Sequence, residues 1–276
     1  MTKFQRSFSK FLNIFFYKKI KFELLKHNQS LIQNYKSKSF FLIPFPKEKS
    51  PIFNYDNLAT SNNHFFLKDK KFISAKSKAE KRWKTNNPRN ISWRLHFVLY
   101  FINFSLRNAS KEDIFIECGT GKGYMAEAIF NYFKWNENNP PFFLIDTFLP
   151  YNADNNSDQK KNKNIPFCYC TDFNEIQDNF LKYNNVNILK GSCPEVLKKI
   201  PTKKKVIFAH IDLNNATSEL ETMKFLFNNN FLKKGSVIIF DDYGANKKLS
   251  KSLLNYLKKL KKDILMSPTG QGIIIF

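Results

Sequence analysis

The stretch "FIECGTGKGYMAEAI", residues 115–129, is an apolar run that is interrupted by three glycines within five positions and then continues as a helical pattern. Three glycines so close together cost chain entropy, so the backbone of residues 119–123 must adopt a conformation, or approach a ligand, that side chains would prevent. The pattern predicts a strand, a tight turn and a helix, with a ligand lying against the turn.

Two phosphate-binding patterns do not fit this glycine turn, residues 119–123. A dinucleotide fingerprint needs its third glycine where Tyr124 stands. A P-loop needs a glycine in place of Ile116 and a serine or threonine in place of Gly123. Glu117, two positions before Gly119, instead places a carboxylate at the end of the strand, where it can hold a cationic group. The alternative is that the glycines only make a tight turn between strand and helix.

Short apolar segments alternate with helical patterns from residue 113 onward. The strand-like segments are "IFIEC", "PFFLID", "VNILKG", "KVIFAHID" and "GSVIIFDD", and the helical patterns lie near 122–133, 172–183, 193–199, 217–230 and 246–261. The final "ILMSPTGQGIIIF" breaks at residues 268–270 as a hairpin does. This order predicts an α/β fold with a doubly wound, mostly parallel seven-stranded sheet and a C-terminal antiparallel hairpin. Ligands bind such sheets at the carboxyl ends of the strands.

We expect three segments, with boundaries at 1–63, 64–110 and 111–276. Residues 1–63 combine a helix with a stretch from residue 28 onward that has no periodicity and contains three prolines, which predicts an irregular linker or lid. In residues 64–110, helical patterns near 71–84 and 93–106 predict helices that cover the sheet, the second of them at one edge of the domain that follows.

The N-terminal helix is basic and amphipathic, because Phe4, Phe8, Phe11 and Phe15 recur at helical spacing among lysines and arginines. Such a helix packs on the protein body or on a partner subunit, as in a homodimer. It can also lie on an anionic membrane surface as a peripheral contact, or act as an organellar targeting peptide. These alternatives stay open.

The formal net charge of +22 is distributed unevenly. Residues 1–90 hold 20 basic and 5 acidic residues, a net of +15, while the other 186 residues hold 25 and 18, a net of +7. The excess lies outside the glycine turn, and lysine is abundant everywhere in the chain, so the charge by itself does not favour a nucleic-acid partner.

Cysteine usage and hydropathy indicate the compartment. The four cysteines form no Cys-x-x-Cys pair and fit neither a disulfide framework nor a zinc site, so we expect free thiols in a reducing environment. No apolar run reaches the 18 or so residues of a membrane span, and the N-terminus does not have the pattern of a secretory signal. We therefore expect a cytoplasmic protein, with membrane association through the N-terminal helix as the alternative.

The ends of the second and third strands carry candidate cofactor contacts. Asp146 ends the second strand, where a carboxylate can accept two hydrogen bonds from a ribose diol. The alternative is that Asp146 caps a helix or lies at the surface. Ser192 follows the third strand and is a candidate for contacting an adenine ring.

Carboxylates accumulate at the ends of the fourth and fifth strands. Asp212 ends one strand, and Asp241 and Asp242 end the next. We call these three residues the aspartate cluster. Crowded carboxylates raise one another's pKa values unless a cation compensates them, and oxygen ligands suit Mg²⁺. The cluster therefore predicts a magnesium site that would bind and activate a substrate hydroxyl. The alternative is that these acids cap helices or form ion pairs with the abundant lysines.

Taken in order, several segments resemble the macrocin O-methyltransferase (TylF-like) family of class I S-adenosylmethionine-dependent methyltransferases. They are "WRLH", "ECGTGKG", "LIDTF", "GSCPEVL", "HIDLNNATSE", "LKKGSVIIFDDYG" and "SPTGQGIII". The resemblance implies a Rossmann-like fold and methyl transfer from S-adenosyl-L-methionine to a hydroxyl, often of a sugar on a small molecule or glycan. It also implies that Glu117, Gly119, Gly121 and Gly123 lie near the cofactor and that the aspartate cluster binds magnesium.

The resemblance fails at one catalytic position. Family members carry a proposed general base two residues after the first metal aspartate, and here that residue is Asn214, whose amide takes no proton at neutral pH. Either the metal alone activates the hydroxyl, or His210 serves, or the reaction differs; a core histidine is the alternative for His210. Gln271 also belongs to the family pattern, with an open role.

Two other functions compete with this hypothesis. A nucleic-acid methyltransferase that acts on base amino groups commonly has an Asp/Asn-Pro-Pro-aromatic segment after the fourth strand, where this chain has "DLNNA". A cofactor-binding protein of the same fold that has lost catalysis is the other alternative, motivated by Asn214.

Overall fold

The computed structural model describes residues 53–60, 62–85, 88–149, 169 and 172–276. These belong to two compact units, Met1–Asn63 and His64–Phe276. The N-terminal amphipathic helix and most of the polar loop after Asp146 lie outside the described residues. No helix in the described ranges has the length and apolar character that crossing a membrane requires.

The described part of the first unit is an antiparallel hairpin of β1 (Phe53–Tyr55) and β2 (Leu58–Thr60). Asp56 and Asn57 form its two-residue turn, with φ angles of 53° and 61°. Two consecutive residues with positive φ make the turn that matches the twist of paired strands, and Asp and Asn tolerate this conformation well. The prediction that residues 28–63 are irregular throughout is therefore wrong for residues 53–60.

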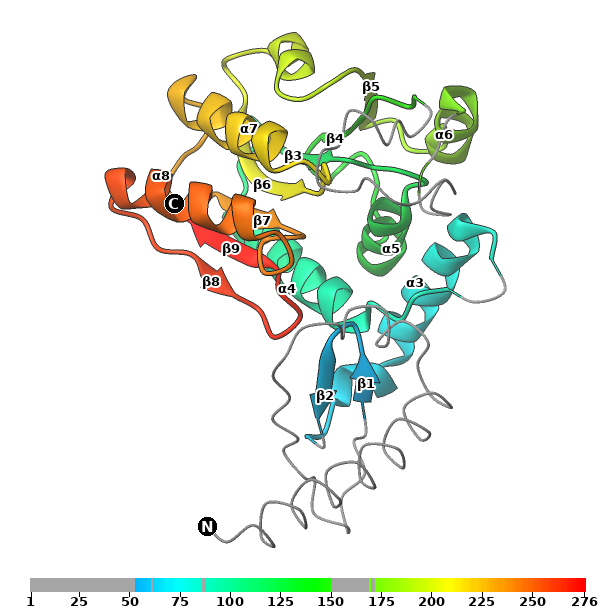
Figure 1. Ribbon diagram of the computed structural model, residues 1–276. Helices are drawn as coiled ribbons and strands as arrows, with labels where there is room; N and C mark the ends of the chain where they lie inside the picture. Colours follow the sequence, from blue (N-terminus) through cyan, green and yellow to red (C-terminus); the bar gives the residue numbers. More distant parts are fainter. Residues whose placement is uncertain (1–52, 61, 86–87, 150–168, 170–171) are drawn as a thin grey trace, which may run out of the picture. The chain divides into compact units, whose positions relative to one another are not determined.

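The second unit is built on a seven-stranded sheet, which confirms the predicted fold class (Figure 1). The strand order is β5-β4-β3-β6-β7-β9-β8. The bounds of the strands are β3 Asp113–Cys118, β4 Phe142–Asp146, β5 Val186–Lys190, β6 Lys205–Ile211, β7 Val237–Phe240, β8 Leu265–Met266 and β9 Gly272–Ile275. The first five are parallel, and the hairpin β8–β9 adds antiparallel strands beside β7.

The α-helices of this unit begin mostly where a short polar side chain caps them. The bounds are α3 Lys70–Glu80, α4 Ser92–Asn108, α5 Tyr124–Phe133, α6 Phe173–Phe180, α7 Ala216–Asn228 and α8 Lys247–Leu260, with 3₁₀ helices η1 Phe65–Lys68, η2 Lys81–Trp83 and η3 Glu195–Lys199. The side chains of Asp69, Asp172, Asn215 and Asn246 accept hydrogen bonds from the first backbone N–H groups of α3, α6, α7 and α8.

Both faces of the sheet are buried. One face packs against α3, α4, α5 and α6, and the other against η3, α7 and α8. Alternate residues of the central strands enter the two cores, as Phe115 and Ile116 of β3 do, whereas both residues of the edge strand β8 are exposed. Helix α4 packs on the face over β6 and β7.

The order of the strands determines where a ligand can bind. The chain leaves β3 toward β4 on one side and reaches β6 on the other, so β3 and β6 are neighbours although β4 and β5 lie between them in sequence. Such a reversal opens a crevice at the carboxyl ends of the two strands. The predicted site residues cluster at this edge of the sheet.

Candidate active site

The glycine turn lets the end of β3 approach the end of β6. Gly119, Gly121 and Gly123 have φ angles of +94°, +53° and +79°, which side-chain-bearing residues rarely adopt. A Cβ atom on Gly119 would lie 1.8 Å from the backbone oxygen of Asp212, and one on Gly123 would lie 2.7 Å from the ring of Phe180. The glycines therefore serve close packing as well as the turn.

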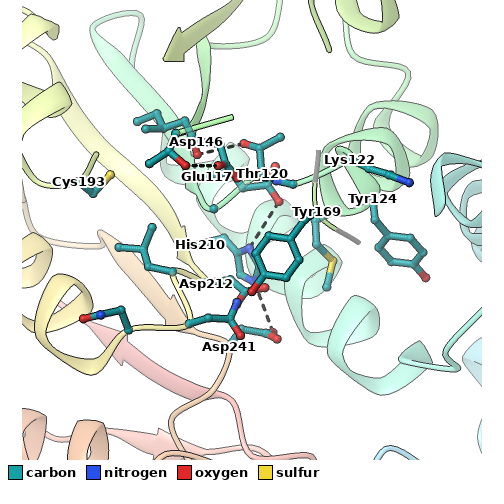
Figure 2. Close-up of a pocket in the computed structure, with 18 of the residues that line it drawn as sticks. Glu117, Thr120, Lys122, Tyr124, Asp146, Tyr169, Cys193, His210, Asp212 and Asp241 are labelled. Carbon is teal, nitrogen blue, oxygen red and sulfur yellow. Dashed lines mark hydrogen bonds and ion pairs between the residues drawn. The ribbon is translucent and has the colours of Figure 1, made fainter. Parts of the chain in front are cut away.

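A cavity of about 440 Å³ opens beside the glycine turn (Figure 2). This volume is within the range of small-molecule sites. Most of the predicted site residues line it: Glu117, Gly119, Gly121, Asp146, Ser192, His210, Asp212, Asn214 and Asp241. Gly123 and Asp242 do not line it.

Asp146 supports the glycine turn from the neighbouring strand. Its Oδ2 accepts a hydrogen bond from the backbone N–H of Gly121 at 2.8 Å, and its Oδ1 accepts one from Phe148 at 3.1 Å. The carboxylate is therefore fixed at the edge of the cavity. Its contact with a ribose, and that of Ser192 with an adenine, stay predictions.

Glu117 is a buried carboxyl with an unused acceptor. It is 2% exposed, and its Oε2 has no hydrogen-bond partner among the residues that the structure describes. Burial raises the pKa of Glu117, which the neighbouring His210 partly opposes. A buried acceptor without a donor is costly, so a ligand that brings a donor or a cation to this position gains affinity.

His210 lies between two acids (Figure 2). Its Nε2 is 3.4 Å from Oδ1 of Asp241, and its Nδ1 is 3.6 Å from Oε1 of Glu117. Burial alone would lower the pKa of His210, but the hydrogen bonds with Asp241 and Glu117 outweigh burial and raise it to about 10. Carboxyls facing both ring nitrogens favour the protonated imidazole, which suits a general base poorly.

Asp241 is paired with an arginine that the predicted site did not include. Nη1 of Arg94, on α4, donates to Oδ2 of Asp241 at 2.6 Å and to its backbone oxygen at 2.7 Å. The side-chain amide of Gln271 donates to Oδ1 at 2.8 Å. Burial would raise the pKa of Asp241, but Arg94 and His210 outweigh it and lower that pKa below its usual range.

The aspartate cluster does not have the arrangement of a metal centre. No group of three or more His, Cys, Asp or Glu side chains in the described part of the chain is placed to hold a metal ion. Both oxygens of Asp241 already have cationic or amide partners, and Asp242 lies 3.7 Å from the Arg94 guanidinium. The geometry thus does not support the predicted magnesium site, and the ion-pair alternative holds for Asp241, with an arginine in place of a lysine.

Asp212 differs from Asp241 in its surroundings. Its Oδ1 accepts a hydrogen bond from the side-chain amide of Asn214 at 3.0 Å, and it lines the cavity. Burial and the charges of Asp241 and Asp242 raise the pKa of Asp212 well above its usual value. Asn214, whose φ is 52°, thus orients a carboxyl that binds a proton more readily than an exposed aspartate does.

Sequence reasoning missed several residues of this site. Arg94 carried two signals, since it stands in the "WRLH" segment of the family resemblance and is the one arginine in an apolar helical stretch, "SWRLHFVLYFINF". Trp83 and Tyr124 line the cavity and stack at 4.2 Å between ring centroids, and nothing in their local sequence indicated it. Buried Glu219 of α7 has its pKa raised to about 9 by burial and by the charges of Asp212 and Asp242.

Comparison with known proteins places the chain in a family. The family model "Macrocin-O-methyltransferase (TylF)" matches residues 106–267, more than half of the chain. A search of curated proteins finds no match.

Solved structures share the fold at low sequence identity. The calicheamicin methyltransferase CalS11 is similar with a TM-score of 0.54 and 14% identity, over 75% of this chain and 93% of that chain. The O-methyltransferase NovP has a TM-score of 0.51 and 15% identity, over 66% and 78%. The chain therefore belongs to the macrocin O-methyltransferase (TylF) family and is an S-adenosylmethionine-dependent O-methyltransferase.

Proposed function

We propose that this protein transfers a methyl group from S-adenosyl-L-methionine to a hydroxyl of a sugar, carried by a small molecule or a glycan. The observation that carries the proposal is the cavity, whose lining brings Glu117 and two glycines of the turn together with Asp212 and Asn214. One structural relative is described as a TDP-rhamnose 3'-O-methyltransferase, which supports a sugar acceptor.

The reaction requires the acceptor oxygen in line with the methyl carbon and the sulfonium sulfur. The oxygen bonds to the methyl carbon as the carbon–sulfur bond breaks, the sulfonium becomes a thioether, and the hydroxyl proton must leave. Positioning supplies much of the rate in such a transfer. The chain's part is to hold both partners in the cavity and to accept the proton.

Asp212 is the residue best suited to accept that proton among the three predicted catalytic residues. The amide of Asn214 has no basic site, and the ring nitrogens of His210 both face carboxyls, which raise the pKa of His210 and favour its protonated form. Asp212 lines the cavity with its carboxyl oriented by Asn214, and burial and the neighbouring charges of Asp241 and Asp242 raise its pKa, which strengthens its affinity for a proton. Asn214 orients this carboxyl and His210 fixes Asp241, so both act as positioning residues.

The test has two stages. Calorimetry with S-adenosyl-L-methionine should show binding at one site, and a panel of nucleotide-linked sugars and glycosides should then yield S-adenosylhomocysteine and a methyl ether. Asp212→Asn should retain cofactor binding and lose most of the turnover. A protein that binds no cofactor would favour the alternative of a catalytically inactive relative, and methylation of RNA but of no sugar would favour the nucleic-acid alternative.

Magnesium assistance, which the sequence predicts, is a separate matter. Asp241 already has Arg94 and His210 as cationic partners within the chain, and no step of the proposed mechanism is assigned to a metal ion.

A further inference from the structure

Negative charge is concentrated at the ends of β6 and β7. Asp212, Asp241 and Asp242 come from adjacent strand ends; Asp241 is buried and the other two are partly buried, and a buried charge without a partner is costly. Positive charge must therefore come either from a bound cation or from the protein itself.

Arg94 supplies that charge from inside the protein. Its side chain is 9% exposed, it lies 2.6 Å from a carboxylate oxygen of Asp241, and it is 3.7 Å from Asp242. An arginine remains charged at every pH at which the protein is folded, and its planar fork can serve several acceptors at once.

The same guanidinium connects three parts of the fold. It contacts the end of β7 through Asp241, and Nη2 donates to the backbone oxygen of Thr269 at 3.2 Å, in the turn of the C-terminal hairpin. Gln271, from that hairpin, donates to the other oxygen of Asp241. Arginine and glutamine thus hold the carboxylate from two sides, and its orientation is set by side chains of this chain.

We propose that Arg94 is the resident counter-ion of Asp241 and, with Gln271, holds it in a site that needs no divalent cation. The inference builds on the proposed function, because it assigns a positioning role in the same reaction. It departs from the magnesium site that the family resemblance implies. We infer this because both carboxylate oxygens of Asp241 already accept hydrogen bonds from Arg94 and Gln271. In addition, the described aspartates are not arranged as the ligands of one metal ion.

The first experiment uses the wild-type protein. Calorimetric titration with magnesium chloride alone should give no saturable heat, and methyl transfer should be the same with a chelator as with added magnesium. Saturable magnesium binding that Asp241→Asn removes would overturn the proposal, as would a chelator-induced loss of turnover that magnesium restores.

The second experiment separates positioning from general stability. Arg94→Lys keeps the charge but cannot reach Asp241 and Thr269 in the same fork geometry, so we expect kcat to fall by about a hundredfold while KM for the cofactor changes by less than about twofold. Arg107→Met, at an exposed position of the same helix, is the matched control and should leave both constants unchanged. Wild-type kcat in Arg94→Lys would contradict the positioning role.

The two proposals can fail separately. If no sugar hydroxyl is methylated, the proposed function fails, while the titration with magnesium chloride still decides whether Arg94 or a cation compensates Asp241. If Arg94→Lys does not fold, the wild-type titration and the chelator assay decide the matter.

Discussion

Gly119 shows how one residue connects the sequence pattern to the site. Its left-handed backbone and its contact with the backbone of Asp212 leave no room for a side chain. The three-glycine pattern predicted a backbone without side chains next to a ligand. The structure adds that the missing side chain of Gly119 lets the end of β3 approach the end of β6.

The first prediction concerns Gly119→Ala. We expect a loss of more than about 3 kcal/mol in the free energy of unfolding, since the clash with Asp212 adds to the backbone strain, and a large loss of cofactor affinity. Urea unfolding and calorimetry measure the two effects. Gly235→Ala is the matched control, because Gly235 has a φ of +88° and no atom lies within 4 Å of the place where its Cβ would stand. Gly235→Ala should lower the free energy of unfolding by only about 1–2 kcal/mol and leave cofactor affinity unchanged. Equal losses of stability in the two variants would refute the role of close packing at Gly119.

The second prediction concerns the pH dependence that Glu219 imposes. Burial, then the charges of Asp212 and Asp242, raise its pKa from 4.5 to about 9. Between these values the folded state binds more protons than the unfolded chain, so the stability that Glu219 contributes is full below pH 4.5 and is lost as pH rises through 9. Glu219→Gln should remove this slope and become increasingly more stable than the wild type toward pH 9.

Urea unfolding of both proteins across that pH window is the measurement. Glu221→Gln, on the same helix and half exposed, leaves Glu219 in place and should keep the slope. If the free energies of unfolding of the wild type and Glu219→Gln ran parallel when plotted against pH, Glu219 would not titrate in this window.

At the scale of elements, residues at the ends of strands and at the start of a helix line the same cavity. Helix α7 begins at the cavity, and both Asn215 and Ser218 line it. The side chain of Asn215 accepts a hydrogen bond from the backbone N–H of Ser218 at 3.0 Å. Helix α8 begins with the same cap chemistry at Asn246, outside the cavity lining. A comparison of variants at the two caps therefore separates the effect of a lost cap on stability from its effect on catalysis.

The third prediction compares Asn215→Ala with Asn246→Ala. Each should lower the free energy of unfolding by about 1 kcal/mol, because each removes a side chain that accepts two backbone hydrogen bonds at a helix N-terminus. Only Asn215→Ala should also change kcat or KM, because only that helix start borders the cavity. Thermal unfolding and steady-state kinetics measure both, and unchanged kinetics in Asn215→Ala would contradict the expectation.

At the scale of the whole molecule, the basic N-terminal segment and the enzyme belong to separate compact units. Among the described residues, all that line the cavity fall within His64–Phe276. Residues 1–63 carry 11 basic and 3 acidic residues. Membrane contact or dimerisation through the predicted N-terminal helix stays a prediction, and a chain shortened at the boundary between the two units can test it.

The fourth prediction is that residues 64–276 alone bind the cofactor as the full chain does. We expect equal affinity by calorimetry, while only the full chain sediments with vesicles of anionic lipid, and less so as salt rises, since basic segments bind such surfaces electrostatically. Equal sedimentation of both proteins would place the membrane contact elsewhere, and lost cofactor binding in the shorter chain would show that the cavity depends on residues 1–63.

Local patterns in the sequence were enough to predict the fold class and the strand, turn and helix around the three glycines, and most of the residues predicted for the site do line the cavity. Apolar periodicity, glycines in a turn and acids directly after strands are all properties of neighbouring residues. The pairing of charges is not such a property. Arg94 and Asp241 are 147 positions apart, and no local pattern indicates that a helix before β3 places its arginine against the end of β7. Charge compensation depends on distances of a few ångströms in three dimensions, and so the cationic partner of the strand-end acids became visible only in the folded chain.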